Sequence, residues 1–120
     1  MESTVIFTEI RKILMEILDL DEAKISRESY LMRDLGAESV DLLELATALN
    51  ALFKVEINEE AIFLKGLTRI LKDSHASFPF LRSERLHEIA SDLEAGPPVK
   101  VEDLVSYVTW QLEKEKHDVP

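Results

Sequence analysis

The 120-residue sequence has no cysteine, and it holds only three glycines, four prolines and three histidines. Without cysteine it can form no disulfide, thiolate nucleophile or thiolate metal site, so any thiol chemistry needs a prosthetic group that brings its own sulfur. No two histidines stand four residues apart, as they would on one helix face, and we expect no metal site. No apolar run has the length of a membrane span, and the acidic Glu2 is unlike the basic start of a signal peptide, which indicates a cytoplasmic protein.

Basic residues are scarce as well. The sequence has 14 lysines and arginines against 24 acidic residues, a formal net charge of −10 at pH 7. This charge argues against nucleic acid or anionic membranes as partners and favours proteins with basic surfaces. The length and the 46% hydrophobic content fit one folded domain over residues 1–120, which we expect to be a monomer.

Apolar residues recur at three- and four-residue spacings, which predicts an all-α fold with helices over 3–18, 39–53 and 101–112. The first helix has one apolar stripe, formed by Ile6, Ile10, Ile13, Leu14, Ile17 and Leu18. The second is expected to bury Val40, Leu43, Leu45, Ala46, Leu49, Leu52 and Phe53. The polar connection 19–38 contains four apolar anchors, Ile25, Tyr30, Leu31 and Leu35. Val55 and Ile57 indicate an extended piece too short for a sheet.

Two weaker helical patterns lie between residues 64 and 98. Leu64, Leu67 and Leu71 have helical spacing, and a loop is predicted over 74–80. A clearer helix is capped by Ser83 and ends at Gly96-Pro97-Pro98, with Leu86, Ile89, Ala90 and Leu93 on one face. The tail 113–120 is polar and is expected to fray.

A serine stands at the predicted start of the second helix. Gly36 favours a turn just before it, and Ser39 is a residue type that often caps helices. Glu38, Asp41 and Glu44 repeat every three residues and point to similar sides of this helix. From these residues alone, Ser39 is a helix cap and the three acids form a solvated face with favourable dipole interactions.

The residues around this serine match a known pattern. The run Leu35-Gly36-Ala37-Glu38-Ser39-Val40-Asp41, followed by Glu44-Leu45, Ala48-Leu49 and Phe53-Lys54-Val55-Glu56-Ile57-Asn58-Glu59-Glu60, resembles the acyl carrier protein family. The family signature is Leu-Gly-x-Asp-Ser-Leu, from which this chain departs at Glu38 and Val40. The resemblance covers about 3–60 and 101–112. It implies a four-helix bundle in a specialised member, with 64–98 as an insertion that adds one or two helices before the last helix.

The resemblance also implies a function. Ser39 would carry 4'-phosphopantetheine, donated by coenzyme A through a phosphopantetheinyl transferase, which would make the chain a phosphoprotein. The thiol of the arm would hold acyl groups as thioesters for separate enzymes of fatty-acid, lipid or other acyl biosynthesis, so the chain would be a carrier and not an enzyme. Glu38, Asp41 and Glu44 would dock basic enzyme surfaces. The candidates to line an acyl pocket, which are core residues first, are Leu43, Leu45, Ala46, Leu49 and Phe53.

Several alternatives are open at this point. The chain is either a carrier or an unmodified helical interaction module of the same fold. A serine hydrolase is disfavoured, because Ala37-Glu38-Ser39-Val40-Asp41 lacks both glycines of a nucleophile elbow. The segment 64–88 has three acidic and five basic residues, whereas 21–63 has ten and four, so the inserted bases either offset self-repulsion or form a flap for a partner or acyl chain. Trp110 falls opposite the apolar stripe of its helix, and it packs under the insertion, marks a contact surface or is merely exposed.

Overall fold

The computed structural model describes residues 1–65 and 78–117, with the backbone alone for residues 116 and 117. The described residues form helices α1 (Ser3–Leu18), α2 (Ser39–Phe53), α3 (Glu59–Ile62), α5 (Ser83–Ser91) and α6 (Val101–His117). Short 3-10 helices cover Glu22–Lys24 and Leu93–Ala95. No strand occurs in these parts of the chain, and the predicted all-α fold is confirmed. None of the described helices is long and apolar enough to cross a membrane.

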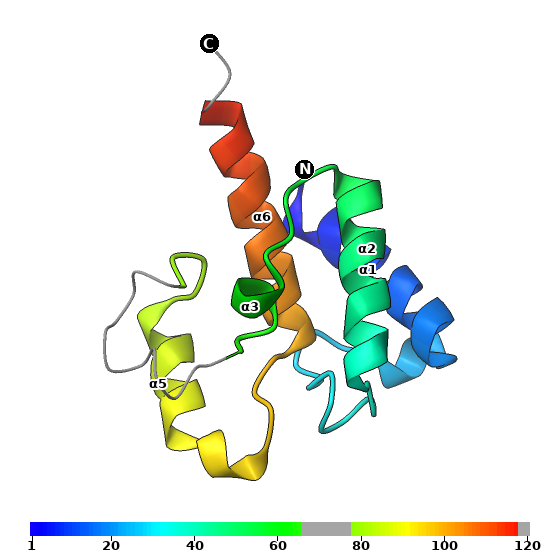
Figure 1. Cartoon of the computed structure of the whole chain (residues 1–120), viewed down its shortest axis with the longest axis vertical. Helices are drawn as coiled ribbons and strands as arrows, with labels where there is room; N and C mark the ends of the chain where they lie inside the picture. Colours follow the sequence, from blue (N-terminus) through cyan, green and yellow to red (C-terminus); the bar gives the residue numbers. More distant parts are fainter. Residues whose placement is uncertain (66–77, 118–120) are drawn as a thin grey trace.

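The two N-terminal helices begin and end where the sequence predicts. Figure 1 shows α6 in the centre, with α5 on one side and α1 and α2 on the other. Helix α1 contacts both α2 and α6. Asp19 and Lys54 adopt left-handed backbone conformations directly after α1 and α2, which ends each helix. The core side of the two helices is made of Ile6, Ile10, Leu14, Leu42, Leu45, Ala46, Leu49 and Phe53.

Three residues expected in the buried face of α2 are exposed, and that expectation is wrong. Val40, Leu43 and Leu52 expose 57%, 54% and 45% of their surface. The buried residues of α2, at positions 42, 45, 46, 49 and 53, form one stripe along the helix, and these three fall outside it. An apolar surface on α2 is therefore available for contacts outside the core.

The connection between α1 and α2 is held down by its apolar anchors. Ile25, Leu31 and Leu35 are buried as predicted, and Tyr30 is half-buried. Tyr30 also forms an isolated antiparallel bridge with Lys100. In this bridge the Leu31 amide donates to the Val99 carbonyl at 3.0 Å, and the Val101 amide donates to the Ser29 carbonyl at 2.9 Å. The loop that leads to α2 is thus tied to the start of α6.

The described part of the insertion consists of 64–65 and 78–98. The helix predicted from Leu64 to Leu71 and most of the loop predicted over 74–80 lie outside the described residues. The prediction that Ser83 caps helix α5 is wrong, because Ser83 is the first helical residue and Arg82 is the N-cap residue. Leu86 and Ile89 are buried as expected, but Ala90 is exposed because the helix turns it toward solvent. The helix ends at Ser91, earlier than predicted, and a 3-10 turn continues to Ala95.

Buried charges join α5 to α6. Arg85 donates to Asp103 through Nε at 2.9 Å and Nη2 at 2.7 Å, and Asp103 is 1% exposed. Lys100 Nζ donates to Glu88 at 2.8 Å and to Glu28 at 3.2 Å. Burial is the largest effect and opposes the charge on Arg85, but the hydrogen bonds to Asp103 together with the charges of Asp103 and Glu88 outweigh it and raise the pKa of the guanidinium. The insertion is therefore attached to the bundle by ion pairs as well as by apolar contacts.

An aromatic cluster covers α6 on the side of the insertion. The Phe80 ring meets Tyr107 edge-on at 5.1 Å between centroids and lies 6.1 Å from Trp110. Trp110 is half-buried and its ring lies against Phe80 of the insertion, so it packs under the insertion, the first of the alternatives. Helix α6 runs to His117, and its predicted end at Leu112 is wrong because 113–117 continue the helix; residues 118–120 lie outside the described chain.

Candidate functional site

Ser39 is the first residue of α2, and its side chain is exposed. The expectation that it caps the helix is wrong, because the N-cap residue is Glu38. The Glu38 amide donates to the Asp41 carboxylate at 2.8 Å, so Asp41 satisfies the amide of the N-cap residue as the N3 member of a capping box. Within the described residues, no hydrogen bond involves the Ser39 hydroxyl. The hydroxyl is therefore exposed and available for reaction.

A tight turn positions the start of α2. Gly36 has φ +73°, a left-handed conformation that favours glycine, and no atom outside its chain neighbours would meet an added Cβ within 4 Å. The Ala37 amide donates to the Leu31 carbonyl at 2.9 Å, and the Tyr30 amide donates to the Asp34 carboxylate at 2.8 Å. Since Leu31 is buried, these bonds fix the turn to the core and hold Ser39 at the surface.

The three acids predicted to dock partners are not equivalent. Glu38 and Glu44 are exposed, whereas Asp41 is half-buried and its carboxylate accepts the capping hydrogen bond. Glu44 can meet a partner without breaking a contact within α2, whereas Glu38 belongs to the capping box with Asp41. Asp41 stabilises the start of the helix. An acidic residue in the first turn of a predicted helix is the sequence signal for this role.

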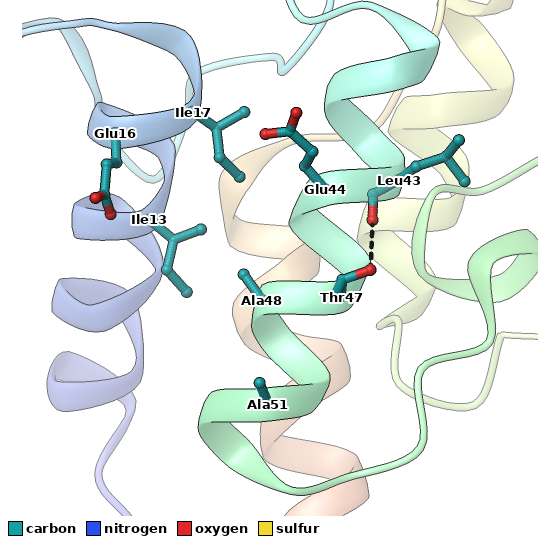
Figure 2. A pocket seen from close by; sticks show the side chains of 8 residues that line it. All are labelled: Ile13, Glu16, Ile17, Leu43, Glu44, Thr47, Ala48 and Ala51. Atoms are coloured by element: carbon teal, nitrogen blue, oxygen red, sulfur yellow. Dashed lines mark hydrogen bonds between the residues drawn. The ribbon is translucent and has the colours of Figure 1, made fainter.

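An open groove of about 640 Å³ lies between α1 and α2 (Figure 2). It is lined by Ile13, Glu16, Ile17, Leu43, Glu44, Thr47, Ala48 and Ala51. Among the predicted acyl-pocket residues Leu43 lines this groove, while Leu45, Ala46, Leu49 and Phe53 are buried in the core.

The α1 side of this groove was missed by sequence reasoning. The only sequence feature that points to this side of the groove is the position of Ile13 and Ile17 at the edge of the apolar stripe of α1. Both lie opposite small side chains on α2. Ser39, Leu43, Thr47 and Ala51 follow one another at four-residue intervals, so the groove continues along the side of α2 that begins at Ser39.

The described residues include no group of three or more histidine or acidic side chains that could hold a metal ion. The group available for reaction at this site is the Ser39 hydroxyl, and exposed acidic residues and an apolar groove lie beside it.

Comparisons with known proteins match the region around Ser39. The family model described as "Phosphopantetheine attachment site" matches residues 8–68. Over 52 residues the chain is 44% identical to an acyl carrier protein of Campylobacter lari, an alignment that covers 43% of this chain and 68% of that relative.

Proposed function

The chain belongs to the acyl carrier protein family, and we propose that Ser39 is the residue that carries its covalently attached 4'-phosphopantetheine. The protein is a carrier and not a catalyst. When bound, the arm supplies the thiol that holds an acyl group as a thioester. The observation that carries the proposal for Ser39 is its exposed hydroxyl at the first position of α2, without a hydrogen bond to any described residue.

The start of α2 suits a phosphate ester. The first amides of a helix and its dipole favour a negative group at the N-terminus. Modification would make the Ser39 oxygen part of a phosphodiester at this end of a 15-residue helix. Because Asp41 and not Ser39 completes the cap, the helix start does not depend on a free serine hydroxyl.

The chain interacts with a phosphopantetheinyl transferase and with acyl-handling enzymes, as its family implies. We propose that basic surfaces of these enzymes contact the exposed carboxylates of Glu38 and Glu44. Asp41 would take part less directly, since its carboxylate is occupied by the cap. Val40, at the position after the serine, is 57% exposed and offers an apolar contact beside the arm.

For the acyl chain, we propose an interior site that opens when the core parts slightly. Ala46, Leu49 and Phe53 are buried on the inner side of α2 and would provide its apolar wall. Burial of an alkyl chain there would be favourable by about 0.8 kcal/mol for each CH₂ removed from water. Leu43 is 54% exposed and would lie outside this interior site.

We further propose that residues 1–120 form a single domain that works in the cytoplasm in fatty-acid, lipid or other specialised acyl biosynthesis. The Arg85–Asp103 ion pair supports the single-domain part of this proposal, because it attaches the inserted α5 to α6. The matched relative is an acyl carrier protein, which supports a place in acyl metabolism without naming the pathway.

Intact mass spectrometry tests the role of Ser39. The full chain, Ser39→Ala and Ser83→Ala are incubated with coenzyme A and a broad-specificity phosphopantetheinyl transferase. Ser83 is the matched control because it is also an exposed first residue of a helix. We expect one phosphopantetheine increment on the parent and on Ser83→Ala, and none on Ser39→Ala.

The alternative function is an unmodified helical interaction module of the same fold. Absence of the increment on the parent with several transferases would favour it. An increment on Ser39→Ala would instead refute the assignment of Ser39. Circular dichroism of each variant ensures that a missing increment is not the result of unfolding.

A further inference from the structure

Arg33 lies in the turn 30–35 before α2, and its side chain reaches the end of the insertion. Its Nη1 donates to the Asp92 carboxylate at 2.7 Å, and its Nη2 donates to the Gly96 carbonyl at 2.8 Å and to the Asp92 carbonyl at 3.2 Å. Asp92 and Gly96 stand on either side of the 3-10 helix Leu93–Ala95. These three hydrogen bonds form a clamp, the Arg33 clamp, in which the arginine side chain is only 15% exposed.

The packing around this arginine is close. Gly96 has φ +126°, a conformation that favours glycine, and an added Cβ would stand 3.4 Å from Nε of Arg33. The guanidinium carbon also lies 4.2 Å from the centroid of the Tyr30 ring. Nε is buried without a hydrogen-bond partner among the described residues, which is unfavourable. The Nη contacts therefore hold the side chain in place against this cost.

The turn 30–35 that carries the arginine also positions the attachment serine. Two of its amides donate to the Tyr30 carbonyl, at 3.0 and 3.1 Å, which closes the turn on itself. The Leu31 carbonyl accepts from the Ala37 amide at 2.9 Å, two residues before Ser39. The Ser39 hydroxyl has no hydrogen bond of its own to a described residue, so its place depends on this turn and on the start of α2.

We propose that Arg33 is a positioning residue for phosphopantetheine transfer, through which the insertion fixes the turn that presents Ser39 to the transferase. The inference rests on the proposed role of Ser39 and gives the insertion a part in it. Arg33 acts through the turn and not on the transferred group, because both of its Nη atoms are occupied by the insertion.

The transfer reaction is sensitive to the place of the serine. The Ser39 oxygen forms a bond to the phosphorus that bears the pantetheine, the pyrophosphate bond of coenzyme A breaks, and the serine proton is released with the adenosine bisphosphate. Such an attack needs the two reacting atoms about 3–3.5 Å apart, and a misplacement of about 1 Å can cost about a hundredfold in rate. A turn released from the Arg33 clamp would hold the hydroxyl less firmly in that position.

Loss of the Arg33 clamp should therefore lower kcat and leave the KM for the carrier chain nearly unchanged. The exposed carboxylates that we propose as the docking contacts, those of Glu38 and Glu44, are kept in every variant. A misplaced hydroxyl weakens only the transition state, which is the signature of equal losses in kcat and kcat/KM. A general loss of stability would not produce this signature in a protein that stays folded.

Initial rates of transfer at varied concentrations of the carrier chain test the proposal. The full chain, Arg33→Met and Arg27→Met are incubated with coenzyme A and a broad-specificity transferase, and the increment is followed by intact mass. Arg27 is the matched control, since it also joins the connection to a distant acid, Glu102, but lies outside the turn 30–35. We expect kcat of Arg33→Met to fall about tenfold and that of Arg27→Met to change less than about twofold.

Asp92→Ala tests the same contact from the insertion. It should lower kcat about threefold, and the double variant with Arg33→Met should lose no more than Arg33→Met alone, because both changes remove one interaction. Glu94→Ala, an exposed acid of the neighbouring 3-10 helix, should leave kcat unchanged. Hydrogen exchange of the Ala37 amide should be about tenfold faster in Arg33→Met than in Arg27→Met.

Three results would overturn the proposal: equal kcat for Arg33→Met and Arg27→Met, a loss that is confined to KM, and additive losses in the double variant. Circular dichroism at the assay temperature establishes that each variant is folded. Should Arg33→Met not fold, the comparison of Asp92→Ala with Glu94→Ala decides, because the Asp92 side chain is 45% exposed. A parent that accepts no phosphopantetheine would refute the role of Ser39 and this inference with it, whereas a modified parent and an unaffected Arg33→Met would refute the positioning role alone.

Discussion

Arg85 and Asp103 form a double hydrogen bond that joins the insertion to the first turn of α6. Nε of Arg85 donates to Oδ1 of Asp103 at 2.9 Å, and Nη2 donates to Oδ2 at 2.7 Å. The Lys100 amide donates to the same Asp103 carboxylate at 2.9 Å, and Arg85 Nη2 also donates to the Pro98 carbonyl at 2.6 Å. The arginine therefore satisfies a buried carboxylate and a backbone carbonyl together.

Replacement of Arg85 by methionine should destabilise the protein strongly. The change keeps much of the side-chain volume but leaves the 1%-exposed Asp103 without its cation. Removing one partner of a buried ion pair costs about 3–5 kcal/mol. Urea unfolding followed by circular dichroism measures the difference. Arg82→Met, an exposed arginine three residues earlier, should change the free energy of unfolding by no more than about 0.5 kcal/mol.

The double variant Arg85→Met/Asp103→Asn checks the cause of this loss. It should be more stable than Arg85→Met alone, because no uncompensated charge is left in the interior. Equal stability of the two would show that the lost packing of the arginine, and not the buried charge, accounts for the effect.

Glu88 should contribute to stability only above acidic pH. The hydrogen bond from Lys100 is the largest cause that lowers the pKa of the Glu88 carboxyl, so the folded state binds fewer protons than the unfolded state in acid. Its contribution is complete above the unfolded-state pKa and is lost as the pH falls through the lower folded-state value. Because the side chain is 50% exposed, we expect less than about 1 kcal/mol at pH 7.

Urea unfolding of the parent and Glu88→Gln between pH 7 and pH 3 tests this dependence. The difference between them should be largest at neutral pH and should shrink as the pH falls below about 4. Glu94→Gln serves as the control, since no ion pair involving Glu94 occurs within the described residues. A difference for Glu88→Gln that does not change with pH would contradict the assignment.

Asp41 and not Ser39 should determine the stability of the α2 start. Asp41→Ala removes the acceptor of the Glu38 amide and a favourable charge in the first turn, and we expect a loss of about 1 kcal/mol. Ser39→Ala should change stability by less than about 0.5 kcal/mol, because the hydroxyl caps nothing. Thermal unfolding of both unmodified variants distinguishes them, and the reverse order would restore Ser39 as the cap.

The single tryptophan reports whether the insertion is docked. Phe80→Leu removes the ring next to Trp110 and Tyr107, for a loss of about 0.5–1.5 kcal/mol per aromatic pair. Trp110 emission should shift to longer wavelength as the indole becomes more hydrated. Phe7→Leu on α1 is the matched control, because Phe7 lies outside the aromatic cluster, and should leave the emission unchanged. An unchanged spectrum in Phe80→Leu would place Phe80 away from Trp110 in solution.

The boundaries of α1 and α2 were predictable because local signals agree there. Each helix has a continuous apolar stripe, and polar residues follow at Asp19 and Lys54. The N-cap residue of α2 was not predictable from the sequence. Serine, glutamate and aspartate all favour helix starts, and the backbone geometry at Glu38 decides between them. The end of α6 was placed early since the residues after Leu112 are polar and their helix has no apolar stripe to reveal it.

The candidate site was predictable only where it is local in sequence. The segment around Ser39 is recognisable from its sequence neighbours, and the structure has Ser39 exposed at the first position of α2. The groove depends on how α1 and α2 pack, and the Arg85–Asp103 pair joins residues 18 positions apart. Neither periodicity nor composition contains that information, because both describe one helix at a time.

The bridge between Tyr30 and Lys100 closes a loop whose ends are 70 positions apart. The insertion at about 64–98 supplies roughly half of that length. The conformational entropy lost on closing a flexible loop rises only with the logarithm of its length, so doubling the loop costs about 0.6 kcal/mol. A single hydrogen bond contributes about as much. Loop closure therefore puts little thermodynamic cost on a change in the length of this segment during evolution, and the contacts that Arg85 and Phe80 make with α6 set the cost of losing it.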